Sequence, residues 1–410
     1  MRRNDRYGPN RSYTRRVRCP AVLALLAVLS CGGSSGTPVS ASLFREWFIA
    51  SGATAPPGLT ATTAGTFDSL REVVRRESRE GSSSVVIADT FGVRYTVGYT
   101  TPAAYENDSL YPCVIYLHGG IGTTRNDKGE HAWEMLRILS DSMDLFLVSP
   151  SGNRSSPWWS PAGLSRILQT LRFMTMHFPV NPDKVFLAGV SDGATGCWAA
   201  ANTIAAPFAG FIAISGFGGM LPRLGMELRP ENLMQRPIYN VNAGRDRLYP
   251  VATVRSFLDG LERQGVGIRR KEYPEEEHGF DYRDREWGTL CSLLREWSLP
   301  DTRGINWFVQ GTHPFCISGI IAVERSGSGP FFIHEYPRND SIFLQTGGID
   351  GLQIYFDMET NSRGSRIFSI NNSGSRRIRP KTPDGNMLLR YMKQCCFPVI
   401  TGGEVYTISL

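Results

Sequence analysis

A series of short, uninterrupted apolar runs is the feature that most constrains the fold of this chain. Apolar residues fill nearly every position of these runs, which suits strands buried on both faces of a parallel sheet. The runs lie at residues 113–117, 145–148, 185–188, 211–214 and 238–241. Stretches with helical spacing separate several of them, at residues 133–139, 162–178 and 194–204. This alternation of strand and helix predicts an α/β fold with a doubly wound, mostly parallel sheet.

The chain continues beyond this unit. At 410 residues it is longer than a single hydrophobic core usually supports, which is about 250–300 residues. A helical pattern at residues 287–297 closes the α/β unit, for which we predict the bounds 66–300. After residue 304 short strand-like runs are broken by Gly, Asn, Asp and Ser, which predicts a small C-terminal all-β domain at residues 305–410. Its composition indicates nothing more specific than a scaffolding or surface-binding role.

The N-terminus has the composition of a secretory leader. The first eighteen residues hold seven arginines, and an apolar run follows that is shorter than the roughly 20 residues needed to span a bilayer. Residues 28–31, Val-Leu-Ser-Cys, resemble the lipobox of bacterial lipoproteins, in which the cysteine is lipidated. We therefore expect a signal peptide at residues 1–31, lipidation of Cys31, a tether at residues 32–65, and export to a membrane-anchored position. Within the tether, the apolar patch at residues 43–49 is the exception, because its pattern suits a short amphipathic helix. The alternative is a plain cleavable signal on a secreted or periplasmic protein.

The charge of the chain gives no sign of a nucleic-acid partner. The formal net charge is +6, but the arginines of the leader account for it and the remainder is close to neutral. Nucleic-acid binding requires a basic surface on the folded part of a protein. We therefore predict no nucleic-acid partner.

The sharpest local signal is Gly-Val-Ser-Asp-Gly at residues 189–193. It has the form G-x-S-x-G and lies between a predicted strand and a predicted helix. A nucleophilic serine on such a tight turn needs glycines on both sides, because side chains there would crowd the turn. The pattern alone occurs by chance, but this context predicts Ser191 as a nucleophile rather than a structural turn serine.

A serine hydroxyl needs a base to take its proton, and the chain offers six histidines. Only His278 lies both after Ser191 and within the α/β unit, on an expected loop behind the strand-like residues 269–273. The acid that orients it should lie between the two, and Asp246 follows a predicted buried strand. Asp259 is the competitor, but the helical stretch around it indicates a solvated surface residue. The order serine, aspartate, histidine is the one expected of this fold.

A fourth element is Leu-His-Gly-Gly-Ile at residues 117–121, at the end of another apolar run. Glycines let backbone N–H groups approach the negative oxygen of a tetrahedral intermediate. We predict oxyanion-hole donors among the amides of Gly119, Gly120 and Ile121, together with the amide of Asp192. A glycine turn without catalytic duty is the alternative.

Together these motifs resemble those of α/β-hydrolase serine esterases of the secreted, polyester-depolymerase-like group, which is related to prolyl-oligopeptidase-type peptidases. The resemblance covers residues 93–297 and rests on four segments, at residues 118–120, 189–193, 244–246 and 278–280. It implies an α/β-hydrolase fold, hydrolysis by a triad of Ser191, Asp246 and His278, and no metal or organic cofactor. It implies no particular substrate, because one fold hosts many activities.

The sequence bears only weakly on specificity. Trp158 and Trp159 follow the end of a predicted strand, where the clefts of α/β folds open. They could stack on a sugar or an aromatic acyl group, and ordinary packing accounts for them equally well. The leading hypothesis is a carboxylic-ester hydrolase that takes a small-molecule or polymeric ester through an acyl-enzyme. The alternatives are a prolyl-oligopeptidase-type serine peptidase and a non-catalytic binding protein on a hydrolase fold.

Overall fold

The computed structural model describes residues 39–50, residues 55 and 59, residues 64–299 except 79, 104 and 107, and mainly the strands between residues 306 and 409. The predicted leader and Cys31 lie outside these residues. Residues 39–410 form one compact unit. In the part of the chain that is described, no helix is long and apolar enough to cross a bilayer.

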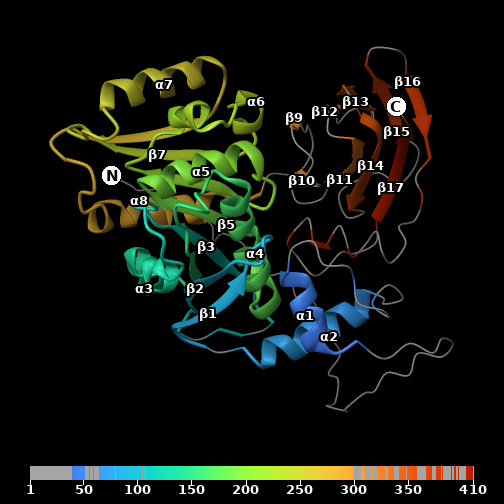
Figure 1. The fold of residues 1–410 in the computed structure, drawn as a ribbon, viewed down its shortest axis with the longest axis horizontal. Helices are drawn as coiled ribbons and strands as arrows, with labels where there is room; N and C mark the ends of the chain where they lie inside the picture. The colour runs from blue at the N-terminus through green and yellow to red at the C-terminus, as the bar shows by residue number, and fades with distance from the viewer. Residues whose placement is uncertain are drawn as a thin grey trace, which may run out of the picture. The chain divides into compact units, whose positions relative to one another are not determined.

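An eight-stranded sheet forms the centre of the α/β unit, with the strand order β1-β2-β4-β3-β5-β6-β7-β8 (Figure 1). The strands from β4 to β8 in this order are parallel, whereas β1 and β2 pair antiparallel at one edge. The predicted doubly wound, mostly parallel sheet is therefore confirmed. The strands are β1 (Ser83–Ala88), β2 (Arg94–Thr100), β3 (Tyr111–Leu117), β4 (Phe146–Pro150), β5 (Val180–Val190), β6 (Gly210–Ile214), β7 (Ile238–Ala243) and β8 (Ile268–Tyr273).

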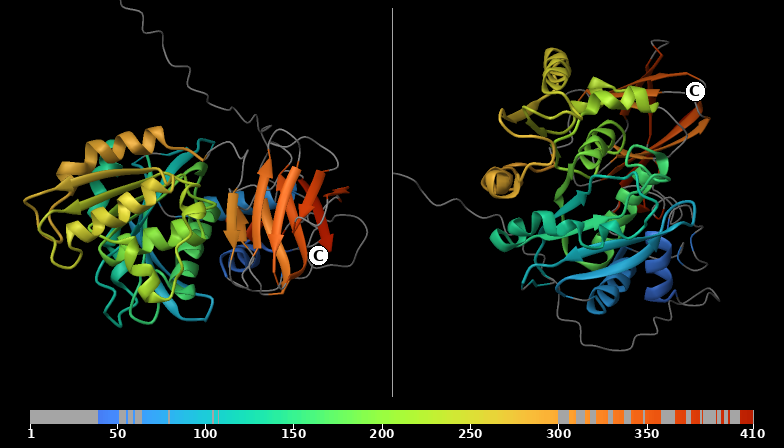
Figure 2. Two further views of the ribbon diagram at one scale, coloured as in Figure 1. Left: turned by 90° about the horizontal axis from the view of Figure 1, so that it is seen from above. Right: turned by 60° about the vertical axis from the view of Figure 1, so that its left-hand side comes forward.

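Helices cover both faces of this sheet (Figure 2). Val114 of β3 belongs to a buried cluster with residues of α3 and α8, whereas its neighbour Ile115 belongs to a second cluster with residues of α4, α5 and α7. Because successive side chains of a strand point to opposite faces, burial of both faces accounts for the continuous apolar runs. The helices are α3 (Arg137–Ser142), α4 (Pro161–His177), α5 (Asp192–Thr203), α6 (Pro230–Leu233), α7 (Val251–Arg263) and α8 (Arg283–Glu296).

The segment predicted as a tether contains a packed helix, α1 (Ala41–Ile49). Its side chains Phe44 and Trp47 are buried in a cluster that also holds Val74 of the next helix, α2 (Ala64–Arg76). The apolar patch excepted from the tether is therefore a helix, and its aromatic face is packed rather than exposed.

Two further sheets follow the α/β unit and confirm the predicted C-terminal β region. One has the order β10-β11-β14-β17 and the other β16-β15-β13-β12-β9. All of their neighbouring strands pair antiparallel except β13 and β15. The strands are β9 (Asn306–Val309), β10 (Phe315–Ile317), β11 (Ile321–Gly327), β12 (Phe331–Tyr336), β13 (Ser341–Thr346), β14 (Ile349–Asp357), β15 (Arg366–Ile370), β16 (Ser375–Ile378) and β17 (Gly403–Ser409).

Candidate active site

Ser191 lies on the turn between β5 and α5, at the carboxyl end of the sheet. Its backbone has φ 56° and ψ −119°, a conformation that costs a non-glycine residue about 1–3 kcal/mol. The flanking glycines make this turn possible, because a Cβ on Gly189 would lie 2.4 Å from the backbone of Gly193, and a Cβ on Gly193 would lie 1.9 Å from the carbonyl oxygen of Leu117. The turn raises the serine side chain above the strand ends.

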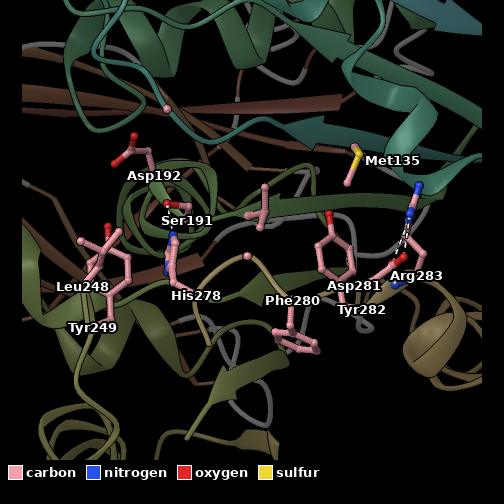
Figure 3. Close-up of a pocket in the computed structure, with 13 residues that line it drawn as sticks. Met135, Ser191, Asp192, Leu248, Tyr249, His278, Phe280, Asp281, Tyr282 and Arg283 are labelled. Atoms are coloured by element: carbon pink, nitrogen blue, oxygen red, sulfur yellow. Dashed lines mark hydrogen bonds and ion pairs between the residues drawn. The ribbon is translucent and has the colours of Figure 1, made fainter. Parts of the chain in front are cut away.

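The structure brings the three predicted triad residues together. Two of them, Ser191 and His278, are seen side by side in Figure 3. The Nε2 atom of His278 lies 3.0 Å from Ser191 Oγ, and its Nδ1 atom lies 2.8 Å from Asp246 Oδ2. Asp246 belongs to the loop between β7 and α7, and His278 to the loop between β8 and α8. Three loops at the carboxyl ends of three strands thus form one hydrogen-bonded chain.

The Asp246 carboxylate is held from three directions. Its Oδ1 atom accepts hydrogen bonds from the backbone N–H groups of Leu248 at 2.8 Å and Tyr249 at 2.9 Å, and its Oδ2 atom faces His278. The side chain has no exposed surface. A carboxylate with these partners assigns the proton of the neutral imidazole to Nδ1, which leaves Nε2 free to accept from the serine hydroxyl. The competitor Asp259 instead lies on α7 and pairs with Arg270 at the surface.

The oxyanion loop, residues 118–121, lies directly against the nucleophile. A Cβ on Gly119 would be 2.9 Å from Ser191 Cβ, and Gly120 has a φ of +64° and lines the pocket beside Ser191. The Ile121 N–H donates to Asp192 Oδ2 at 3.0 Å. The prediction that the Ile121 amide serves as an oxyanion donor is therefore wrong, since the Asp192 side chain occupies it.

The amides of Gly120 and Asp192 are the predicted oxyanion donors that lie in the pocket beside Ser191. Neither N–H has an acceptor within the described part of the chain. The Asp192 amide is the first of α5, and the first N–H groups of a helix have no partner inside the helix. Both residues line the same pocket as Ser191.

The ring of His118 fixes the oxyanion loop from behind. Its Nδ1 lies 2.9 Å from the Gly119 carbonyl oxygen, and its Nε2 accepts a hydrogen bond from the Gly152 N–H at 3.0 Å. Burial disfavours the charged form and lowers the pKa of His118 to about 4. The ring is therefore neutral at pH 7, with its proton on Nδ1 donated to Gly119.

The paired tryptophans do not contact the pocket. Trp158 is fully buried, and its Nε1–H donates to the His118 carbonyl oxygen at 3.0 Å. Trp159 is half-buried against the same hydrophobic core. The prediction that Trp158 binds substrate is wrong, because its ring is buried in the packing behind the oxyanion loop. For Trp159 a substrate role stays a prediction. Neither belongs to the residues that line the pocket.

A pocket of about 780 Å³ opens beside Ser191 and His278. Its lining is largely apolar and includes Met135, Tyr249, Phe280 and Tyr282 (Figure 3). These residues were not predicted from the sequence, although Tyr249, Phe280 and Tyr282 stand within four positions of Asp246 or His278. No group of three or more His, Cys, Asp or Glu in the described residues is arranged to hold a metal ion.

At one end of the pocket lies an ion pair between Asp281 and Arg283. Two nitrogens of the guanidinium contact both carboxylate oxygens, at 2.9 and 2.7 Å. The hydrogen bonds from Arg283 lower the pKa of Asp281 to about 2. This end of the pocket therefore carries two charged side chains that neutralise each other.

Comparison of the sequence with protein families and with curated proteins found no match. Solved structures with a similar fold include a thermostable esterase that is 22% identical, with a TM-score of 0.42; the match covers 53% of this chain and 63% of that chain, less than two thirds of its length. S-Formylglutathione hydrolase from Staphylococcus aureus is 17% identical, with a TM-score of 0.41 and coverages of 53% and 98%. A thermophilic esterase from the planctomycete Thermogutta terrifontis is 13% identical, with a TM-score of 0.43 and coverages of 52% and 94%. At these identities the likeness concerns the fold alone.

Proposed function

We propose that this chain is a serine hydrolase that cleaves carboxylic esters through an acyl-enzyme intermediate. The observation that carries the proposal is the unbroken chain from Ser191 Oγ through the His278 ring to the Asp246 carboxylate, with contacts of 3.0 and 2.8 Å. A serine, a base and a buried acid in this arrangement are the parts needed to activate a hydroxyl as a nucleophile. The strained backbone at Ser191 adds support, because such strain is concentrated at functional sites.

Acylation begins when Ser191 Oγ attacks the ester carbonyl carbon and its proton passes to His278 Nε2. The carbonyl double bond opens, and its electron pair becomes the negative charge of an oxyanion. The N–H groups of Gly120 and Asp192 are the donors available to this oxygen. The buried Asp246 carboxylate stabilises the imidazolium that forms and keeps its ring in register.

Collapse of this intermediate expels the alcohol, which takes the proton from His278 Nε2. The acid portion of the substrate is then bound to Ser191 as an ester. A water molecule repeats the sequence: it gives a proton to His278, attacks the acyl carbon, and releases the acid while Ser191 regains its hydrogen. Every proton in the cycle passes through one nitrogen atom.

The pocket supports an ester with an apolar portion. Met135, Phe280 and Tyr282 contribute apolar and aromatic side chains to the lining of the pocket that contains Ser191. Sites of this kind hold ligands by apolar contact and fix them by a few polar groups. Both a small ester and the end of a polymeric ester meet these requirements.

Turnover of two chromogenic substrates tests the proposal. The mature protein is incubated with short-chain nitrophenyl esters and, separately, with aminoacyl nitroanilides, and both are repeated with Ser191→Ala. We expect ester turnover that is lost in the variant. Anilide turnover would instead favour a prolyl-oligopeptidase-type peptidase, and silence with both would favour a non-catalytic binding protein.

We also propose that the chain is exported and anchored to a membrane through a lipid on Cys31. The support is the leader, in which an arginine-rich start and a short apolar run precede the lipobox-like residues 28–31. Mass spectrometry of the N-terminal peptide from the membrane fraction should show a lipidated cysteine at the new N-terminus. The variant Cys31→Ala should leave that fraction, and an unmodified peptide that starts elsewhere would overturn the proposal.

A further inference from the structure

Lys128 is an exposed residue whose ammonium group is bound to the oxyanion loop. Its Nζ atom donates to the carbonyl oxygen of Gly119 at 2.7 Å and to that of Gly120 at 3.0 Å. A side chain at Gly120 would displace this ammonium group, because a Cβ there would lie 2.8 Å from Nζ. Two successive carbonyls next to the nucleophile thus share one cationic donor.

Binding of these carbonyls fixes the amides on the other side of the same peptide planes. A trans peptide is planar and directs its C=O and N–H in opposite directions. The Gly119 carbonyl shares a plane with the Gly120 N–H, and the Gly120 carbonyl shares one with the Ile121 N–H. Lys128 therefore fixes the orientation of two N–H groups. One is the Gly120 N–H, the predicted oxyanion donor, and the other is the Ile121 N–H, which donates to Asp192.

The loop needs such support because of its composition. Adjacent glycines have more conformational freedom than other residues, and Gly120 adopts a φ of +64°. The Gly119 carbonyl accepts a second hydrogen bond, from His118, whereas the donor to the Gly120 carbonyl is Lys128. The positive charge of the Lys128 ammonium group, which binds both carbonyl oxygens, also polarises the two peptide groups. Their N–H groups are stronger donors as a result.

The backbone of Lys128 is itself firmly anchored although its side chain is exposed. The residue begins a short 3-10 helix, η2 (Lys128–Glu130), whose Gly129 is buried against the end of β4. The Gly129 N–H donates to Ser151 Oγ at 2.8 Å, and Ser149 Oγ donates to the Gly129 carbonyl at 2.6 Å. Both serines are fully buried. The ammonium group therefore extends from a fixed point.

We propose that Lys128 is a positioning residue of the oxyanion hole, which holds the Gly119 and Gly120 carbonyls so that the Gly120 N–H points at the developing oxyanion. The inference rests on the proposed function. In this role Lys128 affects the transition state indirectly. Its ammonium group binds the oxyanion loop, and the loop holds the N–H that binds the oxyanion.

Three variants test this role on the full chain. Lys128→Met removes the donors and keeps the length of the side chain, and Lys128→Arg restores cationic donors. Lys184→Met is the matched control, because Lys184 Nζ also binds backbone carbonyls, those of Arg295 at 2.8 Å and of Trp297, away from the pocket. The readouts are kcat and KM for a nitrophenyl ester, the Kd of an alkylboronic acid that forms a tetrahedral adduct with serine, and thermal unfolding.

For Lys128→Met we expect kcat to fall about 10- to 100-fold, somewhat less than the loss of a whole oxyanion donor, with KM within about twofold. The boronic acid should bind more weakly by a similar factor, and Lys128→Arg should recover most of both. Lys184→Met should unfold at a lower temperature with its kcat unchanged.

A Lys128→Met variant with the parent kcat, or one whose kcat loss matches that of Lys184→Met, overturns the inference. The parent protein separates this failure from that of the proposed function. If the parent protein and Lys128→Met are equally active, only the proposed role of Lys128 is contradicted. If the parent protein turns over no ester, both the proposed function and this inference are contradicted.

Discussion

The Asp246 side chain shows how much of the candidate site depends on single atoms. One oxygen of its carboxylate takes two backbone N–H groups and the other takes the ring of His278. An ionised carboxylate is an acceptor at both oxygens, so all three donors are satisfied at once. The same arrangement selects the tautomer of His278 that can accept the serine proton.

Replacement of Asp246 by asparagine tests this arrangement. An amide accepts at only one of its two ends, so its NH₂ group must face either the His278 ring or the two backbone donors. We expect Asp246→Asn to lower kcat for a nitrophenyl ester by about 10³–10⁴, with a small change in KM. The matched control is Asp259→Asn on the surface of α7, which should keep the parent kcat. Equal activities of the two variants would contradict the role of Asp246.

At the scale of elements, the turn from β5 to α5 is a closely packed point of the fold. Gly189, Gly193 and the end of β3 approach so closely that no additional atom fits between them. This close approach is what places Ser191 beside the oxyanion loop. A second link between elements is the buried ion pair of Asp89 and Arg166, which joins the turn between β1 and β2 to α4.

Gly193→Ala tests the turn, because its Cβ would lie 1.9 Å from the Leu117 carbonyl oxygen. We expect the free energy of unfolding to fall by about 3 kcal/mol, or the variant not to accumulate as folded protein. Gly288→Ala is the control: Gly288 is exposed on α8 with open space around it, so alanine should stabilise by up to about 1 kcal/mol. Chemical denaturation measures both. A stable, active Gly193→Ala variant would show that the turn is not as tight as described.

The buried ion pair gives a second prediction at this scale. Arg166 contacts Asp89 Oδ2 at 2.9 and 3.1 Å, and neither side chain has more than 1% exposed surface. Arg166→Met leaves the carboxylate buried without its cation, and we expect a loss of about 3–5 kcal/mol of unfolding free energy. The double variant Asp89→Asn/Arg166→Met should lose less than the sum of the single losses. Additive losses would mean that the two side chains are not coupled.

Much of this organisation could be predicted from the sequence. The parallel strands of the central sheet were predictable because both of their faces are buried. The grouping of Ser191, Asp246 and His278 was predictable because the proposed chemistry demands particular residue types in a particular order. β1 was missed, since it is a half-exposed edge strand. The Ile121 and Trp158 predictions failed because the partners that occupy them, Asp192 and the His118 carbonyl, become neighbours only in the folded chain.

For the whole molecule, two histidines, the buried His118 and the half-buried His177, connect stability to pH. Desolvation lowers the pKa of both His118 and His177 to about 4, whereas an unfolded histidine titrates near 6.5. Between these values the unfolded chain binds more protons than the native one, so stability falls as the pH is lowered from about 6.5 to about 4. Each histidine contributes at most about 3 kcal/mol to this fall.

The variant His177→Gln isolates one of these contributions away from the candidate site. Its unfolding free energy should decline less between pH 6.5 and pH 4.5 than that of the parent, by about 2 kcal/mol at most. His131→Gln serves as the control, since the His131 side chain is 74% exposed, and its decline should match the parent. Urea denaturation at both pH values gives the difference. Parallel declines of parent and His177→Gln would contradict the assignment.

The most direct test of the central claim is covalent labelling by a fluorophosphonate, followed by mass spectrometry of the peptides. Such a probe reacts with a serine only when a base activates the hydroxyl, and it needs no knowledge of the substrate. We predict one label per chain, on Ser191, that is absent in Ser191→Ala and much slower to form in His278→Ala. An unlabelled parent protein, or a label on any other residue, would contradict the claim that Ser191, His278 and Asp246 form a working proton relay.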